Sequence, residues 1–396
     1  MTERSSKIIS IVVLLIIFVF GAGTVLKCKG DIHESLQAGS FAESKTMIEN
    51  SIQNNIKSKN NWINLNGLFQ RAVGTTLVKD PGGTDVYRLH NGQLMYNLPR
   101  QDMTSRADQL EKLYTHSKEH NADFMYIQYP FKIESDEQMP FGSEEYANDN
   151  ADDLMSMLEE KDVPAFDIRG EINKEGYEYD ELFFDTDHHW KPETALWAAG
   201  RIASELDNTY DLGISQDDID FFYDIDNYDI KTYDDWFLGS LGKRTGSWYG
   251  GVDDFDVITP RFPTNYDFYA KSASGDLVRE GDFSDVMFRW DFIVEKDLFG
   301  INTYAGYLGG DYKVTRIVRN DCNNDLKVLI LKDSYSNAML PYLSMVIKDI
   351  TALDLRHYED MTAFENISQN DYDVVIVAYN PSAFSDMQFD FDGISK

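Results

Sequence analysis

The sequence predicts an α/β protein with a mainly parallel central sheet and helices packed on both of its faces. Short apolar runs alternate with helix-length amphipathic segments between residues 104 and 206, and the same alternation returns between residues 327 and 378. This alternation is typical of parallel strands joined by crossover helices. In addition, 42% of the 396 residues are hydrophobic and 13% are aromatic, which is enough apolar material for a large folded core.

The first alternating region predicts two helix–strand pairs followed by a third helix. Pro192 marks the start of that third helix, because proline is favoured at the first helical position. The expected elements are helices at 104–119, 144–161 and 193–206 and strands at 124–129 and 164–168.

The second alternating region is the most regular part of the chain. Between the two regions, from about residue 215 to residue 325, we expect a long irregular insertion that is rich in aromatic and acidic residues. After it, the expected elements are strands at 327–331, 350–354 and 374–378 and helices at 335–346 and 361–367.

An uncharged run of nineteen residues, Ile8 to Leu26, dominates the start of the chain and has basic residues on both sides. A run of this length can cross a bilayer as a helix, and a short basic flank stays on the cytoplasmic side. We therefore expect residues 1–7 to be a cytoplasmic tail and residues 8–27 to be an uncleaved transmembrane signal anchor. The rest of the chain would then lie outside the cell membrane.

Apolar side chains recur at helical spacing in the segment that follows, so residues 28–80 are expected to form a helical juxtamembrane stalk or subdomain. Alternating segments at 75–78, 86–90 and 94–98 predict a small β meander at its end. Residues 81–396 are expected to form the outer domain.

The charge of the chain excludes one large class of partner. The formal net charge is −32, from 68 acidic and 36 basic side chains. A surface of this sign repels a phosphate backbone and offers no basic patch to release its counterions. Nucleic acid is therefore not an expected partner, whereas a glycan is compatible with this charge.

Ser334 follows a predicted strand directly and begins the next predicted helix. In open α/β sheets ligands bind beyond the carboxyl ends of the strands. A hydroxyl at a helix amino terminus also lies beside backbone N–H groups that stabilise developing negative charge. A serine after a strand is equally common as a helix cap, so this segment alone leaves both interpretations open.

Asp185-Thr186-Asp187-His188-His189-Trp190 brings two acids and two imidazoles together in front of a predicted helix. A serine nucleophile needs an imidazole base, and the base needs an acid to fix its tautomer. Asp187 and His189 could supply both from one loop. The same density of ligands is also typical of a zinc or manganese site, and a purely structural role is a third interpretation.

The motif Asp187-His188-His189-Trp190 resembles the name-giving motif of the DHHW proteins. These proteins are similar to the alginate O-acetyltransferase-like proteins, whose domain is an SGNH-hydrolase-like three-layer α/β sandwich. A second motif, Lys332-Asp333-Ser334-Tyr335, lies in the matching order. The resemblance implies that Ser334 is the nucleophile, His189 the general base and Asp187 its orienting partner. It leaves His188, Trp190 and Asp333 as supporting residues and implies neither a metal nor a cofactor.

The donors that would stabilise an oxyanion are less clear from the sequence. The candidates are the loop at Gly239 and Ser240 and the residue Asn380, which ends the last strand and could equally be a strand terminator. One departure from the family pattern is Lys332, which stands where SGNH enzymes usually have glycine. A charged side chain there could reshape the nucleophile turn.

The resemblance implies O-acetyl transfer to a cell-surface polysaccharide of a bacterium through an acetyl-serine at Ser334. Water as the acceptor would make the same triad a carbohydrate acetylesterase. A membrane-bound acyltransferase partner is implied as the source of the acetyl group. A non-catalytic glycan-binding or assembly protein is the rival from another class, and a third interpretation is a metal hydrolase built on Asp185, Asp187, His188 and His189.

Overall fold

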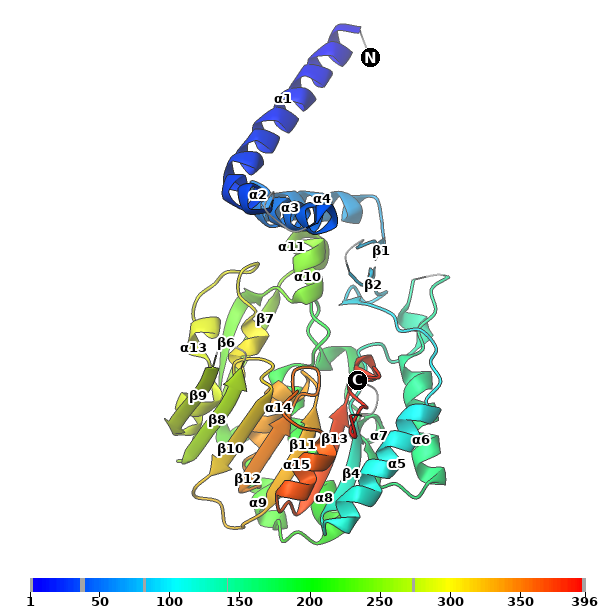
Figure 1. The fold of residues 1–396 in the computed structure, drawn as a ribbon, viewed down its shortest axis with the longest axis vertical. Helices are drawn as coiled ribbons and strands as arrows, with labels where there is room; N and C mark the ends of the chain where they lie inside the picture. Colours follow the sequence, from blue (N-terminus) through cyan, green and yellow to red (C-terminus); the bar gives the residue numbers. More distant parts are fainter. Residues whose placement is uncertain (1–2, 36–39, 81–82, 141, 273–274, 394–396) are drawn as a thin grey trace.

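A helix projects from one end of the molecule, a layer of short helices lies across its base, and a larger sheet-containing domain lies beneath that layer (Figure 1). The computed structural model describes residues 3–35, 40–80, 83–140, 142–272 and 275–393.

The large domain is built on one eight-stranded mixed sheet in the order β5-β4-β13-β11-β12-β10-β8-β9. The first five strands of this order are parallel, and the last three pair antiparallel at the β12 edge. The strands are β4 (Asp123–Gln128), β5 (Ala165–Asp167), β8 (Tyr266–Ser272), β9 (Gly275–Gly281), β10 (Val314–Arg319), β11 (Lys327–Lys332), β12 (Asp349–Leu353) and β13 (Val374–Tyr379).

Helices cover both faces of this sheet, which gives three layers. The alternation along β13 shows this directly, since Val375 and Val377 pack into one core and Ile376 and Ala378 into the other. One layer is formed by α5 (Thr104–Glu119), α6 (Ala147–Glu160) and α15 (Ala363–Gln369), and the other by α7 (Ile168–Glu175), α8 (Pro192–Tyr210) and α14 (Ser336–Leu343).

The stretch from 215 to 325, which we expected to be irregular, is largely regular and supplies three strands of the main sheet. Along β8 the side chains of Tyr266, Phe268 and Ala270 are buried, with Asp267 exposed between them. The acidic outward positions hid this period-two pattern in the sequence. The other elements here are α9 (Gln216–Phe222), β6 (Tyr228–Phe237), α10 (Ser240–Thr245), α11 (Ser247–Gly250), β7 (Asp253–Pro260), α12 (Phe283–Met287) and α13 (Trp290–Ile293).

The segment predicted as a signal anchor, 8–27, lies within a single long helix, α1. Across the described parts of the chain, however, no helix combines the length and the apolar character that crossing a bilayer requires. The first helices are α1 (Glu3–Lys27), α2 (Lys29–Ser35), α3 (Phe41–Asn55) and α4 (Lys59–Ala72).

The segment predicted as a helical stalk or subdomain contains α2, α3 and α4, which lie across the base of α1 and form a helical layer over the large domain (Figure 1). The three segments expected to form a meander do form a small antiparallel sheet next to this layer. Its strands are β1 (Leu77–Val78), β2 (Val86–Arg88) and β3 (Leu94–Met95).

The helical layer is docked onto α10 and α11 through one closely fitted face of α4. A Cβ added to Gly67 would lie 2.3 Å from the Thr245 carbonyl oxygen, so only glycine allows this approach. Beside it, the Asn64 Oδ1 accepts a hydrogen bond of 2.8 Å from the Ser247 N–H. The short helices α10 and α11 therefore connect the helical layer to the domain below.

We expect Gly67→Ala to destabilise the protein by about 2 kcal/mol. Alanine is favoured over glycine in a helix by about 1 kcal/mol, but overpacking against a fixed backbone carbonyl costs about 1–3 kcal/mol and prevails here. Urea unfolding followed by tryptophan fluorescence measures the change. Gly30→Ala is the matched control, because a Cβ added at Gly30 in α2 meets nothing within 4 Å. Equal stability of the two variants would show that α4 is not held by this contact.

Candidate functional site

A series of hydrogen bonds joins Ser334, His189 and Asp187. The Oγ of Ser334 lies 2.7 Å from Nε2 of His189, and Nδ1 of the same ring lies 2.5 Å from Oδ1 of Asp187. Because an ionised carboxylate only accepts, Nδ1 carries the hydrogen and Nε2 is left to accept the hydrogen of the serine hydroxyl. The structure thus brings the three predicted residues together in the order that a serine nucleophile requires.

Ser334 lies in the turn between β11 and α14, at the carboxyl end of a central strand. Asp333 holds this turn, since its Oδ1 accepts from the Tyr335 N–H at 2.9 Å and its Oδ2 from the Asn380 N–H at 2.6 Å. The carboxylate of Asp333 therefore ties the end of β11 to the end of β13. Burial raises the pKa of Asp333 to about 6.

Lys332 does not enter the nucleophile turn. Its side chain is fully buried, and its Nζ donates to Asp311 Oδ1 at 3.0 Å and to Asn337 Oδ1 at 2.8 Å. Asp354 lies 3.6 Å from the same ammonium group, and Arg356 pairs with both of these acids. The positive charge of Lys332, the residue that departs from the family pattern, is thus neutralised in a buried ionic cluster beside Ser334.

The other two members come from residues 185–190, which we call the acid–histidine loop. Two backbone donors at the start of α10 hold this loop. The Ser240 N–H donates to Asp187 Oδ2 at 2.6 Å, and the Gly239 N–H donates to Thr186 Oγ1 at 2.8 Å. A Cβ added to Gly239 would lie 2.3 Å from the Cβ of Asp187, so glycine is required for this close approach.

These contacts decide how the three oxyanion candidates are used. The backbone donors of Gly239 and Ser240 are engaged by the acid–histidine loop and do not face the serine. The side chain of Asn380 donates to the Pro130 carbonyl and accepts from Ser382. All three residues therefore hold the framework of the site. The contacts of Asn380 agree with the alternative interpretation of this residue as a strand terminator.

A buried lysine that the sequence analysis missed supports the acid–histidine loop from beneath. The Nζ of Lys132 donates to three carbonyl oxygens in and beside this loop, those of Asp187 at 2.9 Å, Asp185 at 3.1 Å and Phe184. It also donates to the Leu94 carbonyl oxygen at 2.9 Å. Burial lowers the pKa of this amine to about 8, although nearby carboxylates oppose the shift. The sequence did contain one signal for Lys132, because it lies four residues after β4 and therefore near the carboxyl end of a parallel strand.

Asp253 holds the same loop from its other side. Its carboxylate accepts from the N–H groups of Asp185 and Thr186 at 2.5 and 2.9 Å and from the Thr186 hydroxyl at 2.5 Å. Burial raises the pKa of Asp253 to about 6. Lys132 and Asp253, both distant in the sequence, thus hold the loop from two sides.

Aromatic rings fix the imidazole of His189. The ring of Tyr304 stacks on it with centroids 3.9 Å apart at an interplanar angle of 14°. The Nε1 of Trp190 donates to the Tyr335 carbonyl at 3.0 Å, which ties the acid–histidine loop to the nucleophile turn. Tyr304 had no sequence signal, because it belongs to a stretch predicted to be irregular.

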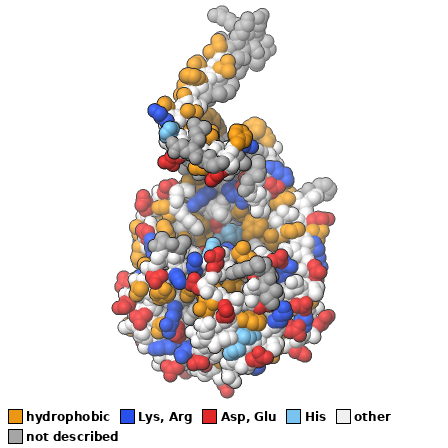
Figure 2. All heavy atoms as spheres, in the orientation of Figure 1, with side chains coloured by type: hydrophobic (Ala, Val, Ile, Leu, Met, Phe, Trp, Pro, Cys, Tyr) orange, Lys and Arg blue, Asp and Glu red, His pale blue; other side chains and the backbone are white. Residues whose placement is uncertain are grey.

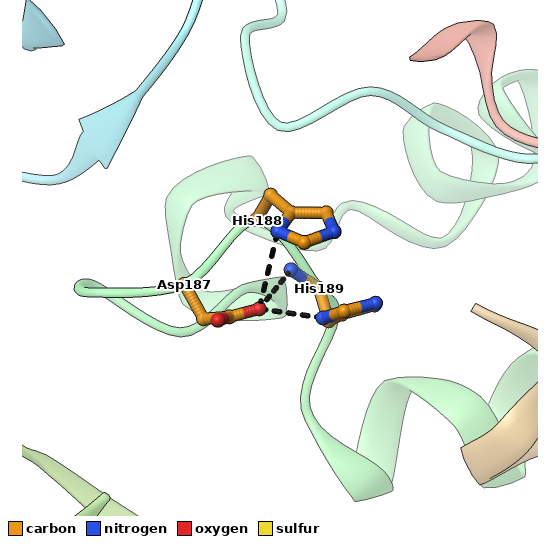
Figure 3. Close-up of side chains that lie close together, drawn as sticks. All are labelled: Asp187, His188 and His189. Atoms are coloured by element: carbon orange, nitrogen blue, oxygen red, sulfur yellow. Dashed lines mark hydrogen bonds and ion pairs between the residues drawn. The ribbon is translucent and has the colours of Figure 1, made fainter. Parts of the chain in front are cut away.

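His188 faces the same carboxylate oxygen of Asp187, and its ring lies beside that of His189 with centroids 3.9 Å apart (Figure 3). Its Nδ1 is 3.4 Å from Asp187 Oδ1 and 3.3 Å from Ser240 Oγ. Burial, followed by the charge of His189, lowers the pKa of His188 to about 3, so this ring is neutral near pH 7. It is placed to support Asp187 rather than to contact the serine.

Asp187, His188 and His189 are also close enough together to hold a metal ion. Both ring nitrogens of His189 are engaged, however, one by Asp187 and one by Ser334. The hydrogen bonds donated by His189 and Ser240 help to hold the pKa of Asp187 well below its usual value, although burial opposes ionisation. A metal would have to break these bonds, so the donor set fits a serine–histidine–acid series better.

A cavity of about 720 Å³ opens at the base of the acid–histidine loop, beside α8. Its lining includes Leu182 and Lys191, which flank the loop and are joined by a hydrogen bond from the Lys191 N–H to the Leu182 carbonyl. The carboxyls of Glu193 and Asp256 also line it. Burial and the adjacent carboxyl of Asp256 raise the pKa of Glu193 to about 8. This cavity is separate from the position of the serine.

We expect Lys132→Met to destabilise the protein by about 3 kcal/mol, because it leaves several buried carbonyl oxygens without a donor. Urea unfolding measures the loss. Lys112→Met, at an exposed position on α5, is the matched control and is expected to remain within about 0.5 kcal/mol of wild type. An equally stable Lys132→Met variant would mean that the loop does not depend on this ammonium group.

The shifted carboxyl of Glu193 predicts a pH-dependent stability. Between its unfolded pKa of 4.5 and its folded pKa of about 8, the folded state binds more protons, so the free energy of unfolding falls as pH rises. Glu193→Gln removes this dependence and is expected to be more stable than wild type at pH 9 by on the order of 2 kcal/mol, with no such gain near pH 4.

Urea unfolding at both pH values tests this prediction. Glu181→Gln, on the exposed rim of the same cavity, should keep the wild-type profile. Parallel profiles of wild type and Glu193→Gln would contradict the prediction.

Comparison with known proteins agrees with the motifs. Residues 89–219 match the family model of the SGNH hydrolase-like domain of the acetyltransferase AlgX. No curated protein matches the chain in sequence. Bacillus cereus PatB1 with a sulfonyl adduct is similar in structure, with a TM-score of 0.63 and 21% identity over 80% of this chain and 98% of that chain. A DHHW family protein from Eubacterium siraeum has a TM-score of 0.57 and 19% identity over 79% of this chain and 96% of that chain.

The two structural likenesses are below 25% identity and establish the shared fold. They confirm the predicted α/β class with a mainly parallel sheet, to which three antiparallel strands are added at one edge. Together with the match over residues 89–219, they confirm that this chain carries an SGNH hydrolase-like domain of the kind found in AlgX and has the fold of a DHHW family protein, as its two motifs predicted.

Proposed function

We propose that this protein is an extracytoplasmic O-acyltransferase that transfers an acetyl group to a cell-surface polysaccharide through an acyl-serine at Ser334. The observation that carries the proposal is the hydrogen-bond series from the Ser334 hydroxyl through His189 to Asp187. The acetyl group is suggested by the AlgX family model, whose description is that of an acetyltransferase. The polysaccharide acceptor is suggested by the resemblance of the Asp187–Trp190 motif to the DHHW and alginate O-acetyltransferase-like proteins.

In the first step the Oγ of Ser334 attacks the carbonyl carbon of an acyl ester. His189 Nε2 takes the hydroxyl proton as the new C–O bond forms. When the tetrahedral intermediate collapses, its bond to the leaving alkoxide breaks and the same nitrogen returns the proton to that oxygen. The products of this step are an acyl-Ser334 ester and a free alcohol.

The second step reverses the first with a sugar hydroxyl in place of the departed alcohol. His189 removes the proton of the acceptor hydroxyl, the sugar oxygen attacks the acyl carbon, and the proton returns to Ser334 Oγ as it leaves. Asp187 keeps the hydrogen on Nδ1 in both steps and stabilises the imidazolium that forms twice. Its pKa is held well below the usual value, so it remains ionised.

The position of Ser334 suits the charge that develops on the carbonyl oxygen. Ser334 precedes α14, and the backbone N–H groups of a helix amino terminus favour negative charge. The Tyr304 ring, stacked on His189, excludes water from one face of the imidazole and strengthens its hydrogen bonds.

Water in place of the sugar hydroxyl would complete the same cycle as a carbohydrate acetylesterase. The second step depends only on which hydroxyl reaches the acyl-serine, so the choice lies in acceptor binding rather than in the triad. We also propose that a membrane-bound acyltransferase supplies the acetyl group. A non-catalytic glycan-binding protein would not require the three groups to be hydrogen bonded in this order.

We expect Ser334→Ala and His189→Ala each to lower kcat/KM for release of 4-nitrophenol from 4-nitrophenyl acetate by about 10³-fold or more, since the nucleophile and its base act as a unit. His120→Ala, at the exposed end of α5, is the matched control and should retain wild-type activity. A chelator should have no effect.

Adding oligosaccharide acceptors then distinguishes transferase from esterase. Acetylated sugar identifies transfer, and acetate alone identifies hydrolysis. Full activity of Ser334→Ala, or loss of wild-type activity in chelator, would contradict the proposed mechanism.

A further inference from the structure

The helix α4 has two contrasting faces. Asn64, Gly67 and Arg71 face the large domain and contact α10 and α11. At helical spacing on the opposite side, the large apolar side chains are exposed, and Phe69 is exposed by 63%. The exposed side chains of this face are Trp62, Leu65, Leu68, Phe69 and Val73. An apolar helix face of this size turned away from the protein marks an interaction surface.

This face is continuous with a second apolar surface on α1. The rings of Phe20 and Trp62 meet edge to face with centroids 5.1 Å apart, which joins the two helices. Along α1, Phe18 is 72% exposed and Leu26 is 74% exposed. Figure 2 shows apolar side chains along the projecting helix and on the helical layer at its base.

The charge of the chain changes at the same boundary. Residues 1–80 contain nine Lys and Arg against six Asp and Glu, whereas residues 81–396 contain 27 against 62. Acidic side chains are dispersed over the visible face of the large domain, especially toward its edge, among basic and apolar ones (Figure 2). An anionic surface would attract the first part of the chain and repel the second, which gives the molecule a preferred orientation on such a surface.

We propose that the helical layer lies on a lipid bilayer with anionic head groups, with the apolar face of α4 inserted at the head-group boundary beside α1. An amphipathic helix with one apolar face and flanking basic residues binds in this way. Lys59, which is exposed at the start of α4, supplies a basic group at that boundary. A bilayer is favoured over a protein partner because the apolar surface continues onto α1 and coincides with the reversal of charge.

This orientation places the Ser334 site close to the bilayer. From the helical layer, the chain of contacts runs from Gly67 to Thr245 at one end of α10 and from Ser240 at its other end to Asp187. A helix of six residues spans about 9 Å, so the acid–histidine loop lies only a short distance below α4. The site would thus face donors that are delivered at the membrane surface, although the proposal itself holds whether or not Ser334 is acylated.

The test uses the full chain with an environment-sensitive nitrobenzoxadiazole label on a single cysteine. Cys28 and Cys322 are first replaced by serine, and the label is placed at Phe69→Cys in one variant and at Val278→Cys in another. Val278 is 64% exposed on β9, in the acidic domain, and is the matched control. Vesicles of phosphatidylcholine with phosphatidylglycerol are then added, with or without a spin-labelled lipid, and circular dichroism verifies folding.

We expect the label at position 69 to shift to shorter wavelength, to brighten about twofold or more and to be quenched by the spin-labelled lipid, as groups entering the interface do. The label at position 278 should not change. Three outcomes would overturn the proposal: no response at position 69, a response only for a label at Phe18→Cys, or shielding of position 69 in native membranes but not in lipid vesicles. The last would identify a protein as the occupant.

Discussion

The hydrogen bond between Asp187 and His189 is the interaction on which the site depends. Two residues apart in one loop, these groups can face each other only if the loop is held in a compact shape. The Lys132 ammonium group donates hydrogen bonds to carbonyl oxygens of the loop, and the Asp253 carboxylate accepts hydrogen bonds from two of its N–H groups. Gly239 allows α10 to approach the carboxylate to a distance that any side chain would prevent. The unusual number of buried charges around one short loop is explained by this requirement.

The nucleophile turn is held by a second set of buried charges, which makes Lys332 a support rather than a defect. Its ammonium group neutralises Asp311 and Asp354, and Asn337 of α14 accepts from it. Asp333 then ties β11 to β13 through the Asn380 N–H. With both ends of the hydrogen-bond series fixed in this way, the 2.7 Å contact between Ser334 and His189 follows from the framework and needs little reorganisation.

The sequence allowed the parallel strands and the three central site residues to be predicted, because each rests on a local signal. The strand before Ser334 is a continuous apolar run, and the acids and imidazoles stand within six residues. The strands β8 to β10 were missed because charged or polar residues separate their apolar ones, so none of them contains a long continuous apolar run. The supports Lys132, Asp253 and Tyr304 were missed for another reason: each acts on a loop far away in the sequence, and such contacts have no local pattern. Gly239 and Ser240, which were predicted as oxyanion candidates, instead donate their N–H groups to Thr186 and Asp187 of the acid–histidine loop.

The proposed reactivity of Ser334 depends on the acid–histidine loop, which fixes His189 as its base, and on a helix amino terminus that favours transient negative charge. Its most direct test is to trap the acyl-enzyme. Protein mixed with 4-nitrophenyl acetate is quenched in acid within the first turnover, and intact mass followed by peptide mapping locates any acetyl group. The account predicts one acetyl group on Ser334 in the wild type and none in Ser334→Ala. An unmodified Ser334 in an enzyme that still releases 4-nitrophenol would contradict it.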